Sequence, residues 1–510
     1  MTEEQILNNI NGYPLDNKQR KVVTTDDKYL LVSAGAGSGK TLTIIGKIRY
    51  LIEIKKLKES EIICISFTNE ATNNLKNKLK ENYGYDIPCY TFHKLGLEIL
   101  KNDNYKITEP DLLKYTIDEY FKGLINQNNE NKKRILTYLK IRYNNRNYEK
   151  KYKNIKEQDL NKVTILIEKF INLLKSNDYN ETNIIEFIKE EQNKQNKALL
   201  TIILYIYYTY QKELISKKEI DFNDMISLAT QKVNKKGYHN KVKYIIIDEF
   251  QDTSLVRFNL IKSILNKTNA NLLVVGDDFQ SIYRFTGCDL SLFVNFTKLF
   301  SNSKILKIEN TYRNSQELIN IAGAFIMKNP NQIRKNLKSN KHIDKPIEIV
   351  YYKNINKTFI KLIEHIYDKT KKSILVLGRN NFDVKLVTNN SKFTIDENKI
   401  IYKNNPNITI HYLTMHRSKG LEESNVIIIN LINKKTGFPN KIANDKILKY
   451  VTCQEDDYPL AEERRLMYVA LTRTKNKTYL LTPEKNESEF VKEIKKNYKK
   501  QIKIVRNNKF

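Results

Sequence analysis

The stretch that most constrains the fold is residues 30–41, which read LLVSAGAGSGKT. An apolar run rich in β-forming residues leads into a glycine-dense turn, and apolar residues then recur at helical spacing from Leu42 to Leu51. This pattern predicts a strand, a loop and a helix in direct succession. Glycines in such a loop let backbone N–H groups converge on phosphate oxygens, and the helix N-terminus adds positive potential. The stretch therefore predicts a cradle for a nucleoside triphosphate.

The side chains at the end of the loop fit the same interpretation. Lys40 can reach the terminal phosphates, and the hydroxyl of Thr41 can hold Mg²⁺. A strict form of the motif has glycine six residues before the lysine, where this chain has Ala34. A chance glycine-rich turn is the alternative, and the flanking strand and helix disfavour it. The backbone predicted to contact phosphate comprises Ala34, Gly35, Ala36, Gly37, Ser38 and Gly39.

Two acidic residues follow a second strand pattern. Residues 244–247 are an uninterrupted apolar run, and Asp248 and Glu249 come directly after it. At such a strand tip Asp248 can hold Mg²⁺, while Glu249 can polarise the water that attacks the terminal phosphate. A charged strand end facing solvent is the alternative, and the phosphate cradle makes it the weaker one. The pair predicts triphosphate hydrolysis.

Polar and aromatic side chains follow three further strand patterns. The apolar run 272–275 leads into Gly276-Asp277-Asp278-Phe279-Gln280, whose polar groups could sense the terminal phosphate. Ligands bind at the carboxyl edge of open parallel sheets, where hydroxyls and flat rings can grip a sugar-phosphate backbone and stack on bases. For the clusters that follow residues 66 and 90, core packing and helix capping are the favoured explanation when each cluster is taken alone. The candidates for nucleic-acid contact are Phe67, Thr68, Asn69, His93, Tyr283 and Phe285.

Composition supports a polyanionic partner. The chain has 88 Lys and Arg against 58 Asp and Glu, a formal net charge of +30, which exceeds what solubility requires. Biased codon usage is the alternative cause, since Lys, Asn and Ile are abundant throughout. The four cysteines (Cys64, Cys89, Cys288 and Cys453) lie far apart and predict neither a disulfide framework nor a zinc site. With no apolar signal core and no membrane-spanning run, we expect a soluble cytoplasmic protein.

The order of the patterns predicts an α/β chain of several domains. We expect a first α/β core over residues 1–100 and 217–300, split by a helical insertion over 101–216, and a second α/β core over 301–484. A basic segment, 485–510, forms either a packed helix and strand or a loose tail. The strands expected in the second core are 305–308, 347–351, 374–377, 426–430 and 478–481. No second phosphate loop follows, but Arg313 and Arg473 suit arginine fingers that neutralise transition-state charge across a cleft.

Taken together and in this order, the motifs resemble those of superfamily 1 DNA helicases of the UvrD/Rep type. The matching stretches are 34–41, 248–252, 276–283 and 472–473, while 416–422 and 462–473 are similar to the DNA helicase IV branch. The family commonly begins its phosphate loop with alanine, as this chain does at Ala34. The resemblance implies two RecA-like motor cores, ATP and Mg²⁺ as cofactors, and single-stranded DNA and its junctions with duplex as partners.

The resemblance also implies a role for each matching residue. Lys40 and Thr41 correspond to the phosphate and Mg²⁺ contacts, Asp248 to the metal-side acid and Glu249 to the catalytic base. Gln280 corresponds to the γ-phosphate sensor, and Arg313 and Arg473 to the two fingers. Gln19 is similar to a glutamine that reads adenine; without the resemblance it would be an ordinary helix glutamine. Tyr312 corresponds to a tyrosine stacked on the base, and Glu422 to a residue near the ribose.

Three departures from the family pattern bear on function. Phe285-Thr286-Gly287 replaces a frequent Trp-Arg-Gly, and Met415-His416-Arg417 brings a charge toward the DNA channel. Only 34 residues separate Arg379 from Thr414, where typical members insert a large mobile subdomain.

The sequence thus predicts an ATP-dependent motor moving 3′ to 5′ on single-stranded DNA. The alternative is a DNA-stimulated ATPase subunit of a repair or defence complex that strips proteins from DNA without unwinding alone. A nucleotide-gated binding protein without turnover and an RNA substrate are weaker alternatives.

Overall fold

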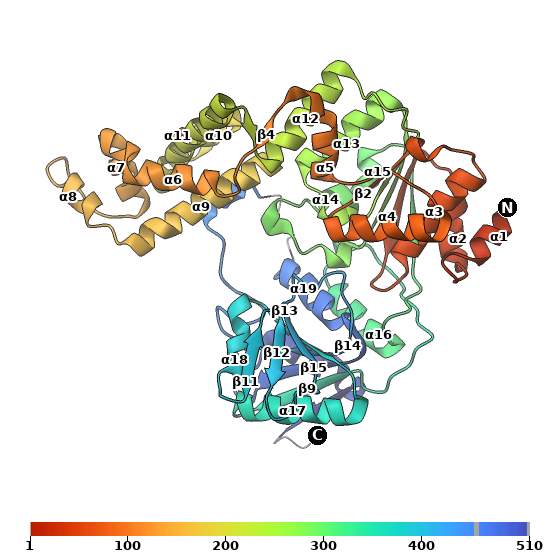
Figure 1. The fold of residues 1–510 in the computed structure, drawn as a ribbon. Helices are drawn as coiled ribbons and strands as arrows, with labels where there is room; N and C mark the ends of the chain where they lie inside the picture. The colour runs from red at the N-terminus through yellow and green to blue at the C-terminus, as the bar shows by residue number, and fades with distance from the viewer. Residues whose placement is uncertain (1, 453–457, 507–510) are drawn as a thin grey trace.

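The computed structural model describes residues 2–452 and 458–506, and these form two sheet-containing lobes and a helical projection (Figure 1). The first lobe carries the N-terminus, the second lies below it in Figure 1, and the helices of the projection extend to one side of the first lobe. Cys453 and residues 507–510 of the basic C-terminal segment lie outside the described residues. The α/β fold class expected from the sequence is confirmed.

The first lobe is built on a six-stranded parallel sheet in the order β3-β2-β6-β7-β1-β8. The four inner strands are almost wholly buried because helices cover both faces of the sheet, which explains their uninterrupted apolar runs in the sequence. The phosphate loop leaves the carboxyl end of β1, and α3 (Lys40–Glu53) begins directly after it. The strands are β1 (Tyr29–Ala34), β2 (Ile62–Ser66), β3 (Cys89–Thr91), β6 (Tyr244–Ile247), β7 (Asn271–Gly276) and β8 (Ser303–Ile308).

The assignment of residues 305–308 to the second core was wrong. These residues form β8, which pairs in parallel with β1 of the first sheet, from Tyr29 opposite Ser303 to Ala34 opposite Ile308. The local sequence pattern of an edge strand does not indicate which strand it pairs with, so this pairing could not be predicted from the sequence. The first sheet therefore extends past residue 300, and Arg313 lies just beyond its last strand.

The second lobe has an eight-stranded mixed sheet in the order β11-β12-β13-β10-β14-β15-β9-β16. Strands β9, β10, β14 and β15 overlap the four remaining expected strands. The basic C-terminal segment is a packed helix and strand, since α20 (Glu489–Tyr498) leads into β16 (Ile502–Val505), which pairs with β9. The other strands are β9 (Ile347–Tyr352), β10 (Ile374–Gly378), β11 (Phe393–Asp396), β12 (Lys399–Tyr402), β13 (Ile410–Thr414), β14 (Glu423–Ile428) and β15 (Thr474–Pro483).

The short connection between Arg379 and Thr414 adds to this sheet instead of forming a separate body. It contains one turn of helix, α18 (Lys385–Thr388), and the antiparallel hairpin β11–β12, whose second strand pairs with β13. Helices α16 (Gln316–Ile326), α17 (Ile355–Thr370) and α19 (Ala461–Leu471) pack around the sheet.

The helical projection lies within the expected insertion. Its helices are α6 (Leu112–Lys122), α7 (Asn129–Tyr138), α8 (Tyr148–Lys153), α9 (Glu157–Ser176), α10 (Glu181–Glu190) and α11 (Lys194–Lys217). Helices α10 and α11 are separate because the chain becomes extended at Glu191 and Asn193 caps α11. Two short strands, β4 (Lys106–Ile107) and β5 (Glu219–Ile220), pair where the projection leaves and rejoins the first lobe.

A segment of the second lobe crosses to the projection. In this strap, residues 440–452, Ile447, Leu448 and Val451 are buried in the hydrophobic core of the projection. Tyr450 stacks on Phe187 of α10 with ring centroids 4.8 Å apart. The strap therefore ties the projection to the second lobe, as the blue trace beside α9 shows in Figure 1.

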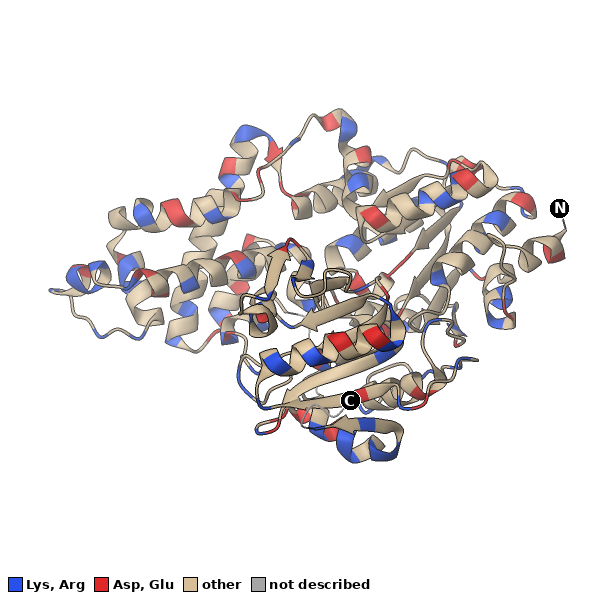
Figure 2. Cartoon of the chain, turned by 60° about the horizontal axis from the view of Figure 1, so that its bottom comes forward, with Lys and Arg blue, Asp and Glu red and all other residues tan. Residues whose placement is uncertain are grey.

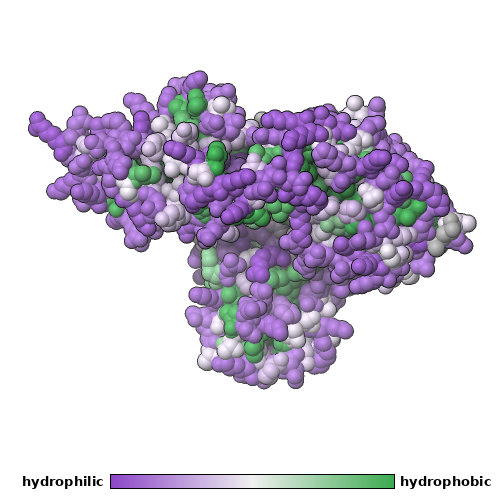
Figure 3. All heavy atoms as spheres, turned by 45° about the horizontal axis from the view of Figure 1, so that its top comes forward, coloured by the Kyte–Doolittle hydropathy of each residue, from purple (hydrophilic) through white to green (hydrophobic). Residues whose placement is uncertain are grey.

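The surface is mainly polar. Lys and Arg are spread over every part of the chain, with acidic residues among them (Figure 2). Figure 3 shows hydrophobic residues gathered in the recess where the two lobes meet. Among the residues that the structure describes, none of the helices combines the length and apolar character needed to cross a membrane.

Candidate active site

A cavity of about 620 Å³ lies where the two lobes meet, and both lobes supply its walls. The first lobe contributes the phosphate loop, the acidic pair and Gln280, and the second contributes the loop after β13 and the end of α19. Most residues predicted for catalysis therefore face one space. Those lining it are Gly35, Gly37, Ser38, Gly39, Lys40, Thr41, Phe67, Thr68, Asp248, Glu249, Gln280, Tyr283, Arg313, Glu422 and Arg473.

The phosphate loop depends on glycine at two positions. Gly37 and Gly39 have φ values of +70° and +76°, a region that other residues adopt only with strain. A Cβ on Gly37 would also lie 2.5 Å from Cβ of Arg313. Gly39 precedes α3 without a side-chain cap, which leaves the helix N-terminus open to an anion.

The acidic pair is held in a polar network. Glu249 has a left-handed backbone (φ +53°), and its N–H donates to Oδ1 of Asp248 over 2.9 Å. Nζ of Lys40 lies 3.1 Å from Oε1 of Glu249. Such strain in a non-glycine residue concentrates at functional sites.

The pKa values of these two carboxyls are shifted in opposite directions. Burial and the neighbouring charge of Glu249 raise the pKa of Asp248 above its usual value. Burial opposes ionisation of Glu249 too, but the charges of Lys40 and Lys419 outweigh it and lower its pKa. Glu249 is therefore the carboxylate ready to accept a proton, and Asp248 is the one that a cation would ionise.

The residues expected to bind Mg²⁺ have suitable chemistry. Asp248 and Thr41 both line the cavity and offer oxygen ligands. Over residues 2–452 and 458–506, no group of three His, Cys, Asp or Glu side chains is placed to hold a metal. Mg²⁺ commonly binds through one or two protein oxygens together with substrate phosphates, so this sparse pair fits that cation.

The two arginines predicted as fingers both face the cavity. Arg473 is 1% exposed and donates to Oε1 of Gln280 over 2.9 Å and to the carbonyl of Leu421 over 3.2 Å. Burial and the nearby charge of Arg313 lower the pKa of Arg473 to about 9. Arg313 pairs with Glu422, with Nε 2.7 Å from Oε2. Two cations held close together in this way favour the arrival of an anion.

Gln19 and Tyr312 lie at the outer side of the phosphate loop and meet at Asp16. The buried Gln19 donates from Nε2 to the carbonyl of Ser38 over 3.0 Å and accepts from the N–H of Asp16. The hydroxyl of Tyr312 donates to Asp16 over 2.8 Å, and its ring is 63% exposed. An exposed ring beside the loop is available for stacking, while Gln19 holds the loop itself.

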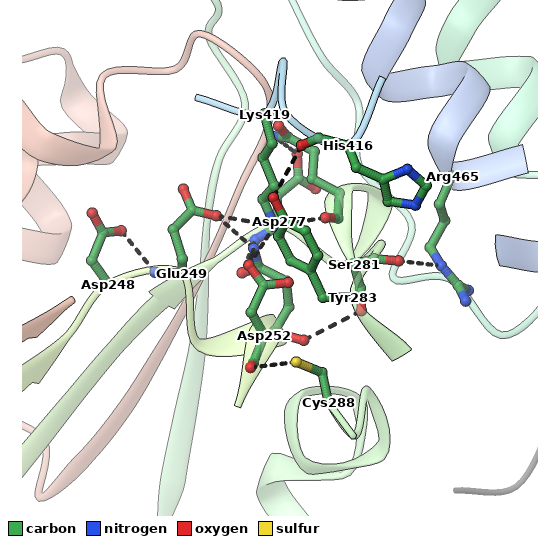
Figure 4. A network of polar contacts seen from close by, with 12 residues as sticks. Asp248, Glu249, Asp252, Asp277, Ser281, Tyr283, Cys288, His416, Lys419 and Arg465 are labelled. Atoms are coloured by element: carbon green, nitrogen blue, oxygen red, sulfur yellow. Dashed lines mark hydrogen bonds and ion pairs between the residues drawn. The ribbon is translucent and has the colours of Figure 1, made fainter. Parts of the chain in front are cut away.

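Lys419 is the main cavity residue that the sequence analysis did not single out. Its Nζ lies 2.5 Å from Oδ2 of Asp252 and 3.7 Å from Oε2 of Glu249, and it donates to the carbonyl of Gln280 over 2.7 Å (Figure 4). It thereby joins the second lobe to the acidic strand end of the first. Its only sequence signal was its place in the stretch 416–422, which resembles the helicase IV branch.

An aromatic cluster adjoins the cavity. The rings of Phe67 and Tyr283 are stacked with centroids 5.6 Å apart, and Phe285 contacts His416 at 5.3 Å. The guanidinium of Arg257 lies 5.0 Å from the ring centroid of Phe67. Phe67 and Tyr283 also line the cavity, so the ring cluster and the nucleotide pocket share walls.

The other candidates for nucleic-acid contact lie at the same sheet edge. Thr68 accepts from the N–H of Ala71 and caps α4 (Asn69–Tyr83), which begins at Asn69. His93 lies against Phe222, with ring centroids 5.0 Å apart. Burial and the charge of Arg257 lower the pKa of His93 to about 4. Phe222 and Arg257 have no local sequence pattern beyond their own residue types, so neither was predicted to lie here.

Two α/β lobes that enclose a phosphate loop, an acidic pair and opposed arginines define the class of two-lobed P-loop nucleoside triphosphatases. The chain belongs to the UvrD/Rep helicase family. The family model described as UvrD/REP helicase N-terminal domain matches residues 15–301, and that of the UvrD-like helicase C-terminal domain matches residues 394–485.

The chain is similar to several curated proteins of this family. It is 27% identical to DNA helicase IV of Escherichia coli K12 over 498 residues, which cover 96% of this chain and 71% of that protein. It is 29% identical to ATP-dependent DNA helicase Rep of Buchnera aphidicola (subspecies Baizongia pistaciae), covering 77% of this chain and 55% of that one. It is also 29% identical to ATP-dependent DNA helicase PcrA of Bacillus subtilis, covering 67% and 43%. The chain thus spans little more than half of Rep and less than half of PcrA.

Proposed function

We propose that this protein is an ATP-dependent DNA helicase or translocase that moves 3′ to 5′ on single-stranded DNA in the cytoplasm. The observation that carries the proposal is the cavity whose walls combine the phosphate loop, the acidic pair and arginines from both lobes. The names of the relatives, DNA helicase IV, Rep and PcrA, support DNA as the substrate and ATP as the fuel.

In the proposed reaction the first lobe binds the triphosphate and supplies the base. Lys40 and the loop amides hold the phosphates, and Thr41 and Asp248 hold Mg²⁺, which supplies charge stabilisation to the phosphoryl group. Glu249 accepts the proton of the attacking water. Arg313 and Arg473 neutralise the charge that develops in the transition state.

The same residues link hydrolysis to movement. Arg313 lies against Gly37 of the phosphate loop, and Arg473 faces the cavity beside Gln280. We expect a bound triphosphate to draw the lobes together through these arginines and hydrolysis to let the lobes part. Tyr283 lines the cavity and belongs to the ring cluster. Rings stack on any base, so we expect grip on single strands and their junctions with duplex without sequence specificity.

A second candidate is a DNA-stimulated ATPase that serves as the motor of a repair or defence complex. The short connection between Arg379 and Thr414, which holds a hairpin and one helical turn, favours it. Family members of the usual type carry a large subdomain there that contacts the duplex. Such a protein would translocate and displace other proteins without separating strands alone.

Two assays test the proposal. ATP hydrolysis is measured with no nucleic acid, single-stranded DNA, duplex DNA or RNA, and we expect single-stranded DNA to stimulate it most. Unwinding is then followed on duplexes carrying a 3′ or a 5′ single-stranded tail. Activity on the 3′-tailed substrate supports the helicase. Stimulated hydrolysis without unwinding supports the second candidate, and hydrolysis indifferent to DNA contradicts both.

A further inference from the structure

A fully buried lysine outside the predicted site lies against the residues that follow β7. The side chains of Lys335, Asp277 and Asp278 all have zero exposure. The Lys335 ammonium pairs with Oδ1 of Asp277 and lies 2.6 Å from Oδ1 of Asp278. Lysine is almost never fully buried unless it is paired, and here it is the counter-charge to two adjacent carboxylates.

The chain around Lys335 is fixed to the first lobe on both sides. Nζ of Lys307, on β8, donates to the carbonyl of Arg334 over 2.6 Å. The side chain of Leu337 fills the space beneath Gly35 of the phosphate loop, where a Cβ would lie 2.5 Å from Cδ2 of the leucine. The position of Lys335 is therefore set relative to the nucleotide loop.

Asp277 connects Lys335 to the cavity through hydrogen bonds to two glutamine side chains. Its Oδ2 accepts from Nε2 of Gln280 over 2.6 Å, which leaves Oε1 of Gln280 to accept from Arg473 over 2.9 Å. The N–H of Asp277 also donates to Oε1 of Gln251 over 2.9 Å, and Nε2 of Gln251 donates to Glu249 over 2.5 Å. The carboxylate of Asp277 thus holds the Gln280 amide, and the backbone N–H of Asp277 holds the Gln251 amide.

We propose that Lys335 is a positioning residue for ATP hydrolysis, acting through Asp277 to hold the Gln280 carboxamide in place between Asp277 and Arg473. The carboxylate accepts from the amide nitrogen and the guanidinium donates to the amide oxygen, so the amide is held from both sides. Without Lys335, the buried Asp277 carboxylate loses the cation that holds its Oδ1, and the Gln280 amide bonded to its Oδ2 moves with it. This role rests on the proposed function.

A double-mutant cycle tests the proposal. The variants are Lys335→Met, Gln280→Ala and both together, and kcat and KM for ATP are measured at saturating single-stranded DNA. We expect Lys335→Met to lower kcat roughly 10- to 100-fold with little change in KM, as for a misplaced catalytic group. In the Gln280→Ala background the same change should lower kcat no further, because residues that act as a unit are not additive.

The matched control is Lys47→Met. The Lys47 side chain is also fully buried, but its ammonium donates to the carbonyls of Val23 and Thr25 and pairs with Asp26, so this variant should keep kcat close to the wild-type value. If Lys335→Met does not fold, Lys335→Met with Asp278→Asn removes the same partner of Asp277 and keeps the formal charge of the cluster at −1.

Two results would overturn the role of Lys335: equal losses of kcat in the presence and absence of Gln280, or an equal loss in Lys47→Met. Failure of the proposed function looks different, since the wild-type protein itself would then show no DNA-stimulated hydrolysis.

Discussion

Lys40 and Glu249 form an ion pair in the cavity, with 3.1 Å between Nζ and Oε1. Both side chains have a second purpose in the proposed reaction, since Lys40 binds phosphate and Glu249 accepts a proton. Bound phosphates would compete with Glu249 for the ammonium and free the carboxylate. The pairing therefore keeps the base ionised until the substrate arrives.

Substitution at this pair separates binding from chemistry. We expect Lys40→Ala to lower DNA-stimulated hydrolysis about 100-fold or more, because it removes a charge aimed at the transferred phosphoryl group. Glu249→Gln should lose hydrolysis to a similar degree yet still bind ATP. Steady-state turnover and the binding of a fluorescent ATP analogue measure the two effects. Retained turnover in either variant would remove the assigned chemistry.

The half-buried histidines beside the ring cluster predict a weak dependence of DNA affinity on pH. Burial, with the charge of a nearby arginine, lowers the pKa of both His93 and His416 to about 4. Because a lowered pKa keeps imidazole neutral above that value, neither ring gains charge between pH 8 and pH 6. Fluorescence anisotropy with a labelled oligonucleotide at constant ionic strength should show no gain in affinity from these rings. A gain on acidification that His416→Asn abolishes would contradict this.

At the scale of elements, the sequence revealed structure wherever a single stretch carries its own signal. The phosphate loop is recognisable from its glycines and from the strand and helix patterns on either side of it. The strand before Asp248 is recognisable from its uninterrupted apolar run. Long-range pairing has no such signal, so β8 was assigned to the wrong sheet, and Lys335 and Lys419 had no assigned role. Both lysines come from segments far from their carboxylate partners in sequence.

The phosphate loop should tolerate no side chain at Gly37. We expect Gly37→Ala to weaken ATP binding, because the left-handed backbone costs about 1–2 kcal/mol and the new Cβ would clash with Arg313 and Thr311. The matched control is Gly84→Ala, which has a similar φ of +75° but nothing within 4 Å of the added atom. Nucleotide titration of both variants checks the prediction, and equal affinities would contradict it.

The strap should contribute to stability through its buried face. Leu448 is 2% exposed in the core of the projection, so Leu448→Ala should lower the free energy of unfolding by about 2–5 kcal/mol. Ile442 lies in the same strap and is 62% exposed, so Ile442→Ala serves as the control and should change little. Thermal unfolding and limited proteolysis measure both variants. Equal effects would show that the strap is not anchored by its apolar contacts.

For the whole molecule, the nucleotide cavity is the place where both lobes and the ring cluster meet. The connection around Lys335, the bridge from Lys419 to Asp252 and the strap all join parts that lie far apart in sequence. Any change in the separation of the lobes must therefore alter these contacts. We therefore propose that the coupling of ATP turnover to DNA binding depends on this whole arrangement and not on one motif.

The most direct test of the account is ATP turnover by the wild-type protein and Arg313→Ala, each with and without single-stranded DNA. We expect DNA to stimulate the wild-type rate, and Arg313→Ala to lower the stimulated kcat about 10³-fold or more while ATP affinity changes little, as for an arginine finger. A wild-type rate that ignores DNA, or a variant that loses only affinity, would contradict the account.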